Sequence, residues 1–306
     1  MRRVSLFLVT ALVSLSLVLS ACASTPAATE TAATEAPATN QDTSAADAPA
    51  AANLSGQLQI AGSTTVQPLA EVLAEKFMEM NPEVTIEIQG GGSSVGVTSA
   101  GEGTVDIGNA SREVKSSEFE KFPNLMVHTI AFDGIAIVTN PELELPSLTK
   151  DLVQGIFAGE ITNYSEVGGP DAEIIVVSRE EGSGTRAAFE ELVLSYKDAN
   201  GETQVKPIVE NAILQQSNGQ VRTTVATTPN TIAYVSFGFL DESVKTVEID
   251  GVEPTSANVK NGTYSIFRPL NMLTNGEPNE LAQAFLDYIL GADGQAIVGE
   301  EYITVK

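Results

Sequence analysis

The sequence is poor in the residues on which disulfide scaffolds and metal centres depend. Its 306 residues include one cysteine, one histidine and no tryptophan. A lone cysteine has no partner for a disulfide within the chain, and no group of Cys, His and carboxylate residues has the spacing of a zinc site. No stretch matches a calcium-binding EF-hand loop or the Gly-Lys-Ser/Thr end of a nucleotide-binding P-loop. We therefore expect neither a metal nor a cofactor.

Positive charge is also scarce. The chain has 16 lysines and arginines against 40 aspartates and glutamates, which gives a formal charge of -24. Binding to nucleic acid requires a basic surface, and docking on anionic lipid headgroups requires a basic patch. The charge balance therefore argues against both kinds of partner.

The amino terminus has the pattern of an export signal. Two arginines precede an apolar run, Val4–Val18, which is too short to span a membrane comfortably. The run is followed by Leu-Ser-Ala-Cys, ending at Cys22, which resembles the lipobox of bacterial lipoproteins. The resemblance implies that residues 1–21 form a cleaved signal peptide and that Cys22 carries a lipid. An ordinary signal followed by a chance cysteine is the alternative.

The next segment, residues 22–53, is dominated by Ala, Thr, Pro, Ser and acidic residues. It has almost no large apolar side chains and cannot offset the entropy that is lost on folding. We expect a disordered tether that holds an exported, lipid-anchored protein on the outer face of the cell membrane, or on its periplasmic side. The folded part then covers residues 54–306.

The folded part alternates between short strand patterns and helical patterns, which favours an α/β architecture. The strand patterns cover residues 56–62, 84–89, 105–110, 135–140, 174–178 and 230–237. The helical patterns cover residues 66–82, 185–196 and 278–290.

Three loops between strand and helix patterns share one composition. They are Ala-Gly-Ser-Thr-Thr at 61–65, Gly-Gly-Gly-Ser-Ser-Val-Gly at 90–96 and Glu-Glu-Gly-Ser-Gly-Thr-Arg at 180–186. Glycines permit tight turns, and Ser or Thr is placed where the unpaired amides at the start of a helix can bind an anion. One such loop is ordinary helix capping. Three of them, together with Arg179 or Arg186, favour one convergent anion pocket.

A different class of protein fits one of these loops. Gly-Ser-Ser-Val-Gly at 92–96 has the spacing of a hydrolase nucleophile elbow, with Ser94 as the nucleophile. Its base would have to be His128, the only histidine, for which a structural or exposed role is the simpler interpretation. A serine hydrolase using Ser94 and His128 therefore stays open as an alternative.

The order of several motifs resembles the phosphate-binding proteins of bacterial ABC-type phosphate importers. The resemblance covers Leu58–Lys306 and rests on IAGSTTVQPLAE, IQGGGSSVG, VDIGNASRE, SREEGSGTR, TPNTIAYVS and PLNMLTNGEP. It implies a type II periplasmic-binding-protein fold, in which two α/β lobes joined by two crossovers enclose a ligand cleft. Lobe 1 would combine residues 54–131 with 232–306, and lobe 2 would be residues 132–231.

The resemblance also implies which residues bind phosphate. The first loop would contribute Thr64 and the amide of Thr65, with Ser63 beside them, and the second loop would contribute Ser93. The third loop would contribute Arg179 as the charged ligand, together with Ser183, Gly184 and Thr185. Arg186 would face outward or pair with a nearby acid.

One position departs from the pattern. Many members have an aspartate after Asn-Ala-Ser, where it accepts the proton of monohydrogen phosphate and so rejects sulfate, whereas this chain has Arg112. Arg112 would add a second cation to the pocket, or it would be a surface residue paired with Glu113. Asp133 is the candidate replacement acceptor, with a turn residue before a strand as its other interpretation.

The sequence as a whole therefore predicts a binding protein and not an enzyme. Its expected partners are inorganic phosphate and an ABC-type phosphate permease with a cytoplasmic ATPase, and the protein itself is expected to be a monomer. The alternatives are another tetrahedral oxyanion such as sulfate, the serine hydrolase, or a lipoprotein that senses its ligand and serves no transporter.

Overall fold

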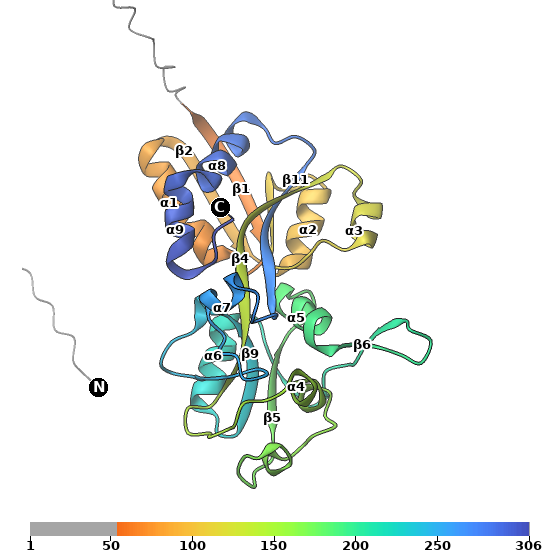
Figure 1. Ribbon diagram of the computed structural model, residues 1–306. Helices are drawn as coiled ribbons and strands as arrows, with labels where there is room; N and C mark the ends of the chain where they lie inside the picture. The colour runs from red at the N-terminus through yellow and green to blue at the C-terminus, as the bar shows by residue number, and fades with distance from the viewer. Residues whose placement is uncertain (1–53, 306) are drawn as a thin grey trace, which may run out of the picture. The chain divides into compact units, whose positions relative to one another are not determined.

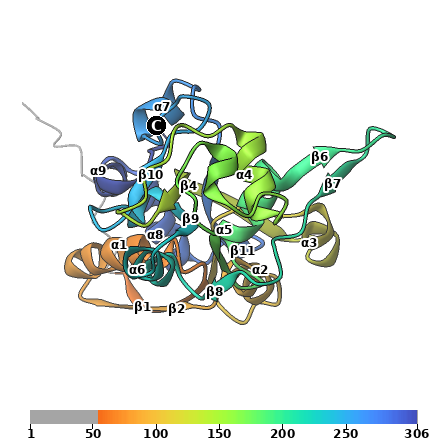
Figure 2. The same ribbon diagram turned by 90° about the horizontal axis from the view of Figure 1, so that it is seen from below.

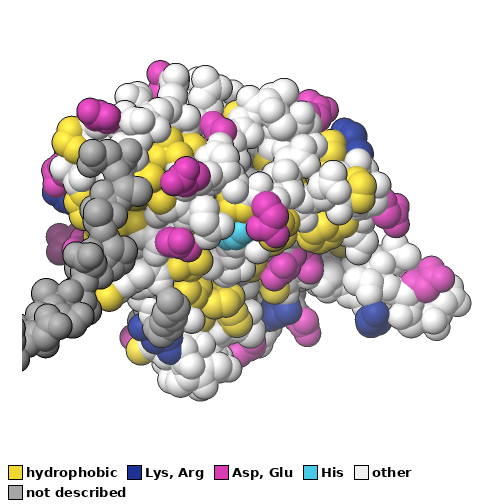
Figure 3. Space-filling model, turned by 90° about the horizontal axis from the view of Figure 1, so that it is seen from above, with side chains coloured by type: hydrophobic (Ala, Val, Ile, Leu, Met, Phe, Trp, Pro, Cys, Tyr) yellow, Lys and Arg dark blue, Asp and Glu magenta, His cyan; other side chains and the backbone are white. Residues whose placement is uncertain are grey.

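The computed structural model describes residues 54–305. The signal peptide, Cys22 and the tether, all expected from the sequence, lie outside the described residues. In the described part, no helix is long and apolar enough to cross a membrane. Figure 3 looks onto one face of the molecule and shows acidic side chains scattered over it, with few lysines and arginines.

A single sheet runs through the described chain (Figure 1). Its strands are not in sequence order, so the chain crosses over repeatedly. The order is β2 (Glu83–Gly90), β1 (Ser55–Gly62), β3 (Ile107–Ala110), β11 (Phe267–Asn275), β4 (Leu125–Thr139), β9 (Thr231–Ser236), β5 (Ile175–Arg179) and β8 (Ile213–Gln215), with β10 (Lys245–Val247) also paired to β4.

Strand β4 divides this sheet into two lobes. Its first part, up to Gly134, pairs antiparallel with β11, whereas its second part, from Ile135 onward, pairs with β9 and β10. The chain returns along β11, where Arg268 lies directly opposite Asp133. Both crossovers therefore pass side by side at one place in the sheet.

The first lobe has a core of its own. Helices α1 (Gln67–Met80), α8 (Glu280–Leu290) and α9 (Ala292–Glu301) cover one face of β1, β3 and β11, and α2 (Ser93–Gly101) covers the other. Leu73 and Phe77 of α1 are buried with Phe285 of α8, as the helical spacing of these apolar residues predicts. Short helix α3 (Ser116–Lys121) lies beyond β3.

The second lobe has a separate core built around aromatic rings. Phe189 stacks on Tyr234 with 4.1 Å between ring centroids, and Phe157 packs edge-on against Phe189. Its helices are α4 (Lys150–Phe157), α5 (Gly184–Phe189), α6 (Asn218–Thr227) and α7 (Ser256–Lys260). Strands β6 (Ser195–Lys197) and β7 (Thr203–Val205) form a hairpin that projects from this lobe (Figure 2).

Two expectations differ from the structure. Residues 232–266 were expected in the first lobe, but Ile232, Tyr234 and Ile266 are buried in the second core, and the chain returns only at Phe267. The strand pattern at 230–237 predicts β9 correctly, but a strand joins whichever sheet pairs with it, and sequence spacing does not specify the partner. The helix expected over 185–196 is α-helical only to Phe189 and continues as a π-helix over Glu190–Leu194.

Candidate functional site

The three glycine-rich loops meet where the two lobes face each other. Strands β1 and β2 are parallel, so the first two loops, which follow them, leave the same edge of the sheet. The amide of Gly92 donates to the carbonyl of Gly62 at 2.9 Å, and the amide of Ser94 donates across the cleft to the carbonyl of Gly182 at 3.1 Å. Backbone hydrogen bonds thus hold all three loops together.

A chain of hydroxyls supports the wall formed by the first lobe. Ser63 Oγ accepts the amides of Thr65 and Val66 and donates to Ser111 Oγ at 2.9 Å. Ser111 Oγ lies 3.4 Å from Ser93 Oγ, which also accepts the Ser111 amide at 3.0 Å. Ser63, expected among the phosphate contacts, therefore has its hydroxyl committed to the loop and to Ser111. The chain of contacts ends at Ser93.

The wall formed by the second lobe begins at Arg179, the last residue of β5. Its side chain is 1% exposed. Nε and Nη2 donate to the Glu180 carboxylate and to the carbonyls of Gln215 and Gln216. Ser183 caps α5 by accepting the amide of Arg186. Arg186 itself pairs with Glu181 and Glu190, which matches the acid-paired role expected for it.

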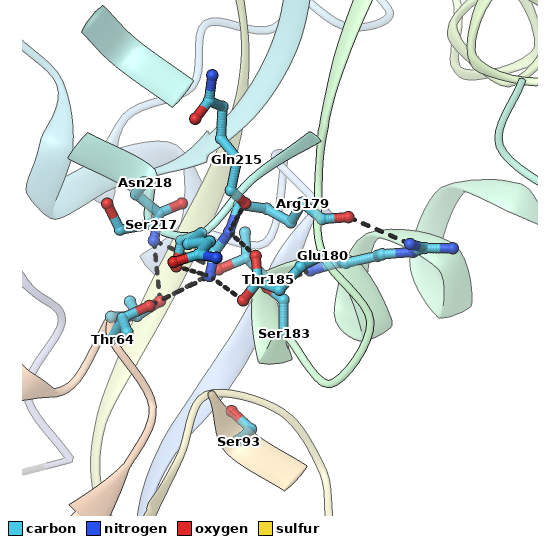
Figure 4. Close-up of polar contacts among 12 residues, drawn as sticks. Thr64, Ser93, Arg179, Glu180, Ser183, Thr185, Gln215, Ser217 and Asn218 are labelled. Atoms are coloured by element: carbon cyan, nitrogen blue, oxygen red, sulfur yellow. Dashed lines mark hydrogen bonds and ion pairs between the residues drawn. The ribbon is translucent and has the colours of Figure 1, made fainter. Parts of the chain in front are cut away.

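Side chains also join the lobes directly (Figure 4). Arg179 Nη2 donates to Thr64 Oγ1 at 3.1 Å, and Asn218 Nδ2, at the start of α6, donates to Thr65 Oγ1 at 2.9 Å. Thr65 Oγ1 lies 3.1 Å from Thr185 Oγ1. Residues that are far apart in sequence are therefore in contact, and the structure is that of a clamp closed over its site.

The closed site is rich in hydrogen-bond donors. Thr64, Ser93 and Ser183 each accept an N–H from the protein, which leaves their own protons for another acceptor. Arg179 Nη1 is buried and has no hydrogen-bond partner in residues 54–305. Buried donors are normally paired, so this arrangement fits a small anion that accepts hydrogen bonds from several sides.

Gly184 lets the lobes approach this closely. A Cβ atom at this position would lie 2.1 Å from Ser93 Oγ and 2.5 Å from Ser111 Oγ, both in the opposite lobe. The residue is buried at the first position of α5. The absence of a side chain at Gly184 therefore lets this loop lie directly against Ser93 and Ser111 of the opposite lobe.

Arg112 is buried, but its charge is balanced. Its guanidinium makes two hydrogen bonds to the Glu118 carboxylate, at 2.7 and 2.8 Å, and one to the carbonyl of Glu113. Only a 3.5 Å contact with Ser94 Oγ connects it to the loops of the site. Arg112 therefore pairs with the carboxylate of Glu118 and not with the side chain of Glu113, which was one of its expected partners.

Asp133 is not a free acceptor. It is 1% exposed, and its Oδ1 accepts from Ser236 Oγ and from the amide of Phe237. Its Oδ2 accepts from Nε and Nη2 of Arg268. Because four protein donors already fill the carboxylate, the geometry argues against Asp133 as the acceptor of a phosphate proton. It is also not a simple turn residue, since it lies within β4.

The structure does not pair Ser94 with His128 as a serine hydrolase would require. His128 Nε2 lies 3.0 Å from Thr274 Oγ1 on the neighbouring strand β11, and burial lowers the pKa of the imidazole. Ser94 Oγ has Arg112 as its side-chain neighbour instead of a base. A nucleophile requires a base within hydrogen-bond reach, so Ser94 and His128 do not form a catalytic pair. Residues 54–305 also contain no group of three His, Cys, Asp or Glu side chains that could hold a metal.

Sequence reasoning missed Ser111, Asn218 and Arg268. Ser111 and Asn218 do have a signal, because each follows the pattern of a polar residue at the end of a strand or the start of a helix. Arg268 directly precedes the PLNMLTNGEP motif, but nothing in the sequence indicates that it is buried or that it faces Asp133.

Comparison with known proteins identifies the family of the chain. The PBP superfamily domain matches residues 33–293. The phosphate-binding protein PstS of Bacillus subtilis is 38% identical over 254 residues, which cover 82% of this chain and 81% of the relative. A crystal structure from Clostridium perfringens is described as a phosphate ABC transporter substrate-binding protein with bound phosphate. It has a TM-score of 0.75 and 40% identity, and it covers 82% of this chain and 100% of that one. An ABC-type phosphate transport receptor from Vibrio cholerae has a TM-score of 0.68 and 34% identity, over 81% and 99% of the two chains.

The two α/β lobes and the site between them define a substrate-binding protein with the type II periplasmic-binding fold. Within that class, the chain belongs to the PstS family of phosphate-binding proteins. The resemblance noted in the sequence is thereby confirmed.

The close approach at Gly184 leads to the first prediction. Gly184→Ala places a methyl group against Ser93 and Ser111, so we expect anion binding to weaken roughly 5- to 150-fold, because overpacking costs about 1–3 kcal/mol. The melting temperature of the ligand-free protein should change little if the lobes can open. Titration calorimetry and thermal unfolding measure the two effects. Gly219→Ala in α6 is the matched control, since the added methyl group would lie 3.9 Å from Ser217 Oγ, an ordinary contact distance.

The ion pair at Arg112 leads to a prediction about pH. Burial opposes ionisation of Glu118, but hydrogen bonds from Arg112 and from the Lys115 amide lower its pKa below the usual value. A carboxyl with a lowered pKa stabilises the fold above the ordinary pKa of about 4.3 and loses that effect as pH falls through its folded pKa. Glu118→Gln should therefore destabilise the protein by about 1–3 kcal/mol at neutral pH. In denaturant unfolding, the difference in unfolding free energy between the variant and wild type should disappear in acid. A difference that stays constant with pH would contradict this origin.

Proposed function

We propose that this protein captures inorganic phosphate outside the cytoplasm and delivers it to an ABC-type permease. The observation that carries the proposal is the closed cage of donors at Thr64, Ser93, Arg179 and Ser183, in a chain of the PstS family. Capture and delivery make and break no covalent bond, so the proposed role is binding and not catalysis. We further propose that the protein acts as a monomer.

The number of donors is sufficient for tight binding. A hydrogen bond to a charged partner contributes about 1.5–3 kcal/mol, and micromolar affinity requires about 8 kcal/mol. Three hydroxyls and the two N–H groups of the free Arg179 nitrogen offer five such bonds, a gross contribution of about 8–15 kcal/mol before closure and immobilisation are subtracted.

The negative charge of the protein does not prevent binding of an anion. The formal charge is -24, but salt screens exposed charges beyond about 8 Å at physiological ionic strength. Local donors decide the affinity inside the closed site, where water is excluded. The acidic surface instead favours solubility.

Sulfate is the second candidate, and a specific observation favours it. Asp133 is filled by four donors and Glu118 is paired with Arg112, so neither carboxylate is placed to accept a proton from the ligand. Calorimetric titrations with phosphate and with sulfate, at pH values on either side of neutrality, compare the two anions. Phosphate selectivity requires tighter phosphate binding throughout, and equal or tighter sulfate binding would overturn the phosphate assignment.

Removing the charged ligand gives a direct test. Arg179→Gln deletes a buried guanidinium that contacts Thr64 and has one nitrogen left for the anion. We expect phosphate affinity measured by calorimetry to fall at least about 100-fold, since two or more charged hydrogen bonds are lost. Arg186→Gln is the matched control, because Arg186 pairs with Glu181 and Glu190, and its affinity should stay within about threefold of wild type. Equal losses in both variants would argue against Arg179 as a ligand.

The amino-terminal residues bear on export and membrane anchoring. We propose that Cys22, after removal of residues 1–21, carries the lipid that tethers the protein to the outer face of the membrane. Cys22→Ser should abolish incorporation of radiolabelled fatty acid and shift the protein from the membrane fraction to the soluble fraction. Unchanged labelling of the variant would exclude Cys22 as the lipid site.

A further inference from the structure

A buried ion pair lies where the chain crosses between the lobes. Arg268 Nη2 is 2.9 Å from Asp133 Oδ2, and the two side chains are 1% and 0% exposed. Asp133 is on β4, which carries the chain out of the first lobe, and Arg268 is on β11, which carries it back. The pair therefore connects the two crossovers.

Only the carboxylate of this ion pair has all of its hydrogen bonds within the protein. Asp133 accepts four hydrogen bonds, so its carboxylate is complete. Arg268 donates to Asp133 through Nε and Nη2, whereas its Nη1 is buried without a hydrogen-bond partner among the residues that the structure describes. A buried guanidinium nitrogen without an acceptor is unfavourable, which points to an acceptor that binds there.

Contacts lead from this pair into the anion site. Ser236, which donates to Asp133 Oδ1, also donates its amide to Asn218 Oδ1 at 3.3 Å. Asn218 Nδ2 in turn donates to Thr65 Oγ1 and lies 3.4 Å from Thr185 Oγ1. Two residues, Ser236 and Asn218, thus link Asp133 to the hydroxyls of the site through hydrogen bonds.

The charge of Arg179 contributes to the electrostatic environment of Arg268. Burial lowers the pKa of Arg268, Asp133 opposes this, and the positive charge of Arg179 lowers the pKa further. Arg179 and Arg268 are also the two residues whose guanidinium groups each have a buried Nη1 without a partner in residues 54–305. Two like charges with unused donors, buried near each other, are stabilised by an anion bound between them.

We propose that Arg268 is a second guanidinium ligand of the bound anion, with Nη1 donating to it opposite Arg179. This inference rests on the proposed binding of phosphate and adds to it a cation that the three loops do not supply. It also explains why Arg112 can be fully paired with Glu118. Because Arg268 lies on a crossover strand, an anion held by it connects the hinge to both lobes.

The test replaces the buried pair as a unit. Arg268→Gln alone leaves Asp133 as an unpaired buried charge, so the main variant is Asp133→Asn combined with Arg268→Gln, with Arg268→Lys as a second variant. We expect phosphate affinity by calorimetry to fall roughly 10- to 150-fold in the double variant. The control is Arg222→Gln, which breaks the surface pair with Asp241 and should leave affinity within about twofold of wild type.

A second readout separates a ligand from a merely structural residue. Phosphate should raise the melting temperature of wild type and of Arg222→Gln, and saturation should require a correspondingly higher phosphate concentration in the double variant. A structural role would lower the melting temperature without phosphate and leave the affinity unchanged. The crystal structure of wild type with phosphate should place Arg268 Nη1 about 3 Å from a phosphate oxygen, and it decides the question even if a variant does not fold.

These experiments distinguish the role of Arg268 from the proposed binding of phosphate. Wild-type affinity in the double variant, or a phosphate-bound structure in which Arg268 Nη1 does not contact the anion, overturns this inference and leaves the proposed function intact. Failure of the wild-type protein to bind phosphate overturns the proposed function itself. Loss of affinity in the double variant together with the contact in the crystal supports the inference.

Discussion

The need to pair buried hydrogen-bond donors governs this site. When the lobes are closed, Thr64, Ser93 and Ser183 each accept an N–H from the protein, and Arg179 and Arg268 each retain one unpaired nitrogen. Unpaired buried donors destabilise a closed form that is empty, and an anion that accepts hydrogen bonds from them removes that cost. Binding and closure are thus thermodynamically linked, because the ligand has a higher affinity for the closed arrangement than for any open one.

The crossovers determine how the two walls can move. Because β4 and β11 carry the chain between the lobes side by side, opening requires changes at only a few backbone positions, as in other hinged proteins. Asp133 and Arg268 occupy these positions and are fully buried. A buried ion pair adds little net stability but is costly to break. In this structure the pair joins β4 and β11 at the point where the register places Asp133 opposite Arg268.

Acidic side chains limit the positive charge available to a ligand. Glu118 pairs with Arg112, and Glu180 pairs with Arg179. Arg186 is held by Glu181 and Glu190. What remains for an anion is a small number of directed N–H and O–H groups and not a diffuse positive field. An acidic protein can therefore have an anion site, since directed donors in a closed cleft act at short range, where the net charge has little influence.

The sequence by itself determined the local chemistry. Glycine next to Ser or Thr at the start of a helix favours a tight, capped turn, so the loops at 61–65, 90–96 and 180–186 could be predicted from spacing, and the place of Arg179 beside them from family resemblance. Strand β9 could also be predicted from the pattern of its own residues. Tertiary structure alone decided the lobe to which β9 belongs, the partner of Arg112, the saturation of Asp133, the burial of Arg268 and the contact of Asn218 with Thr65. Each of these depends on which distant segment packs alongside, and the pairing of strands and side chains far apart in the chain is a property of the whole fold and not of any local pattern.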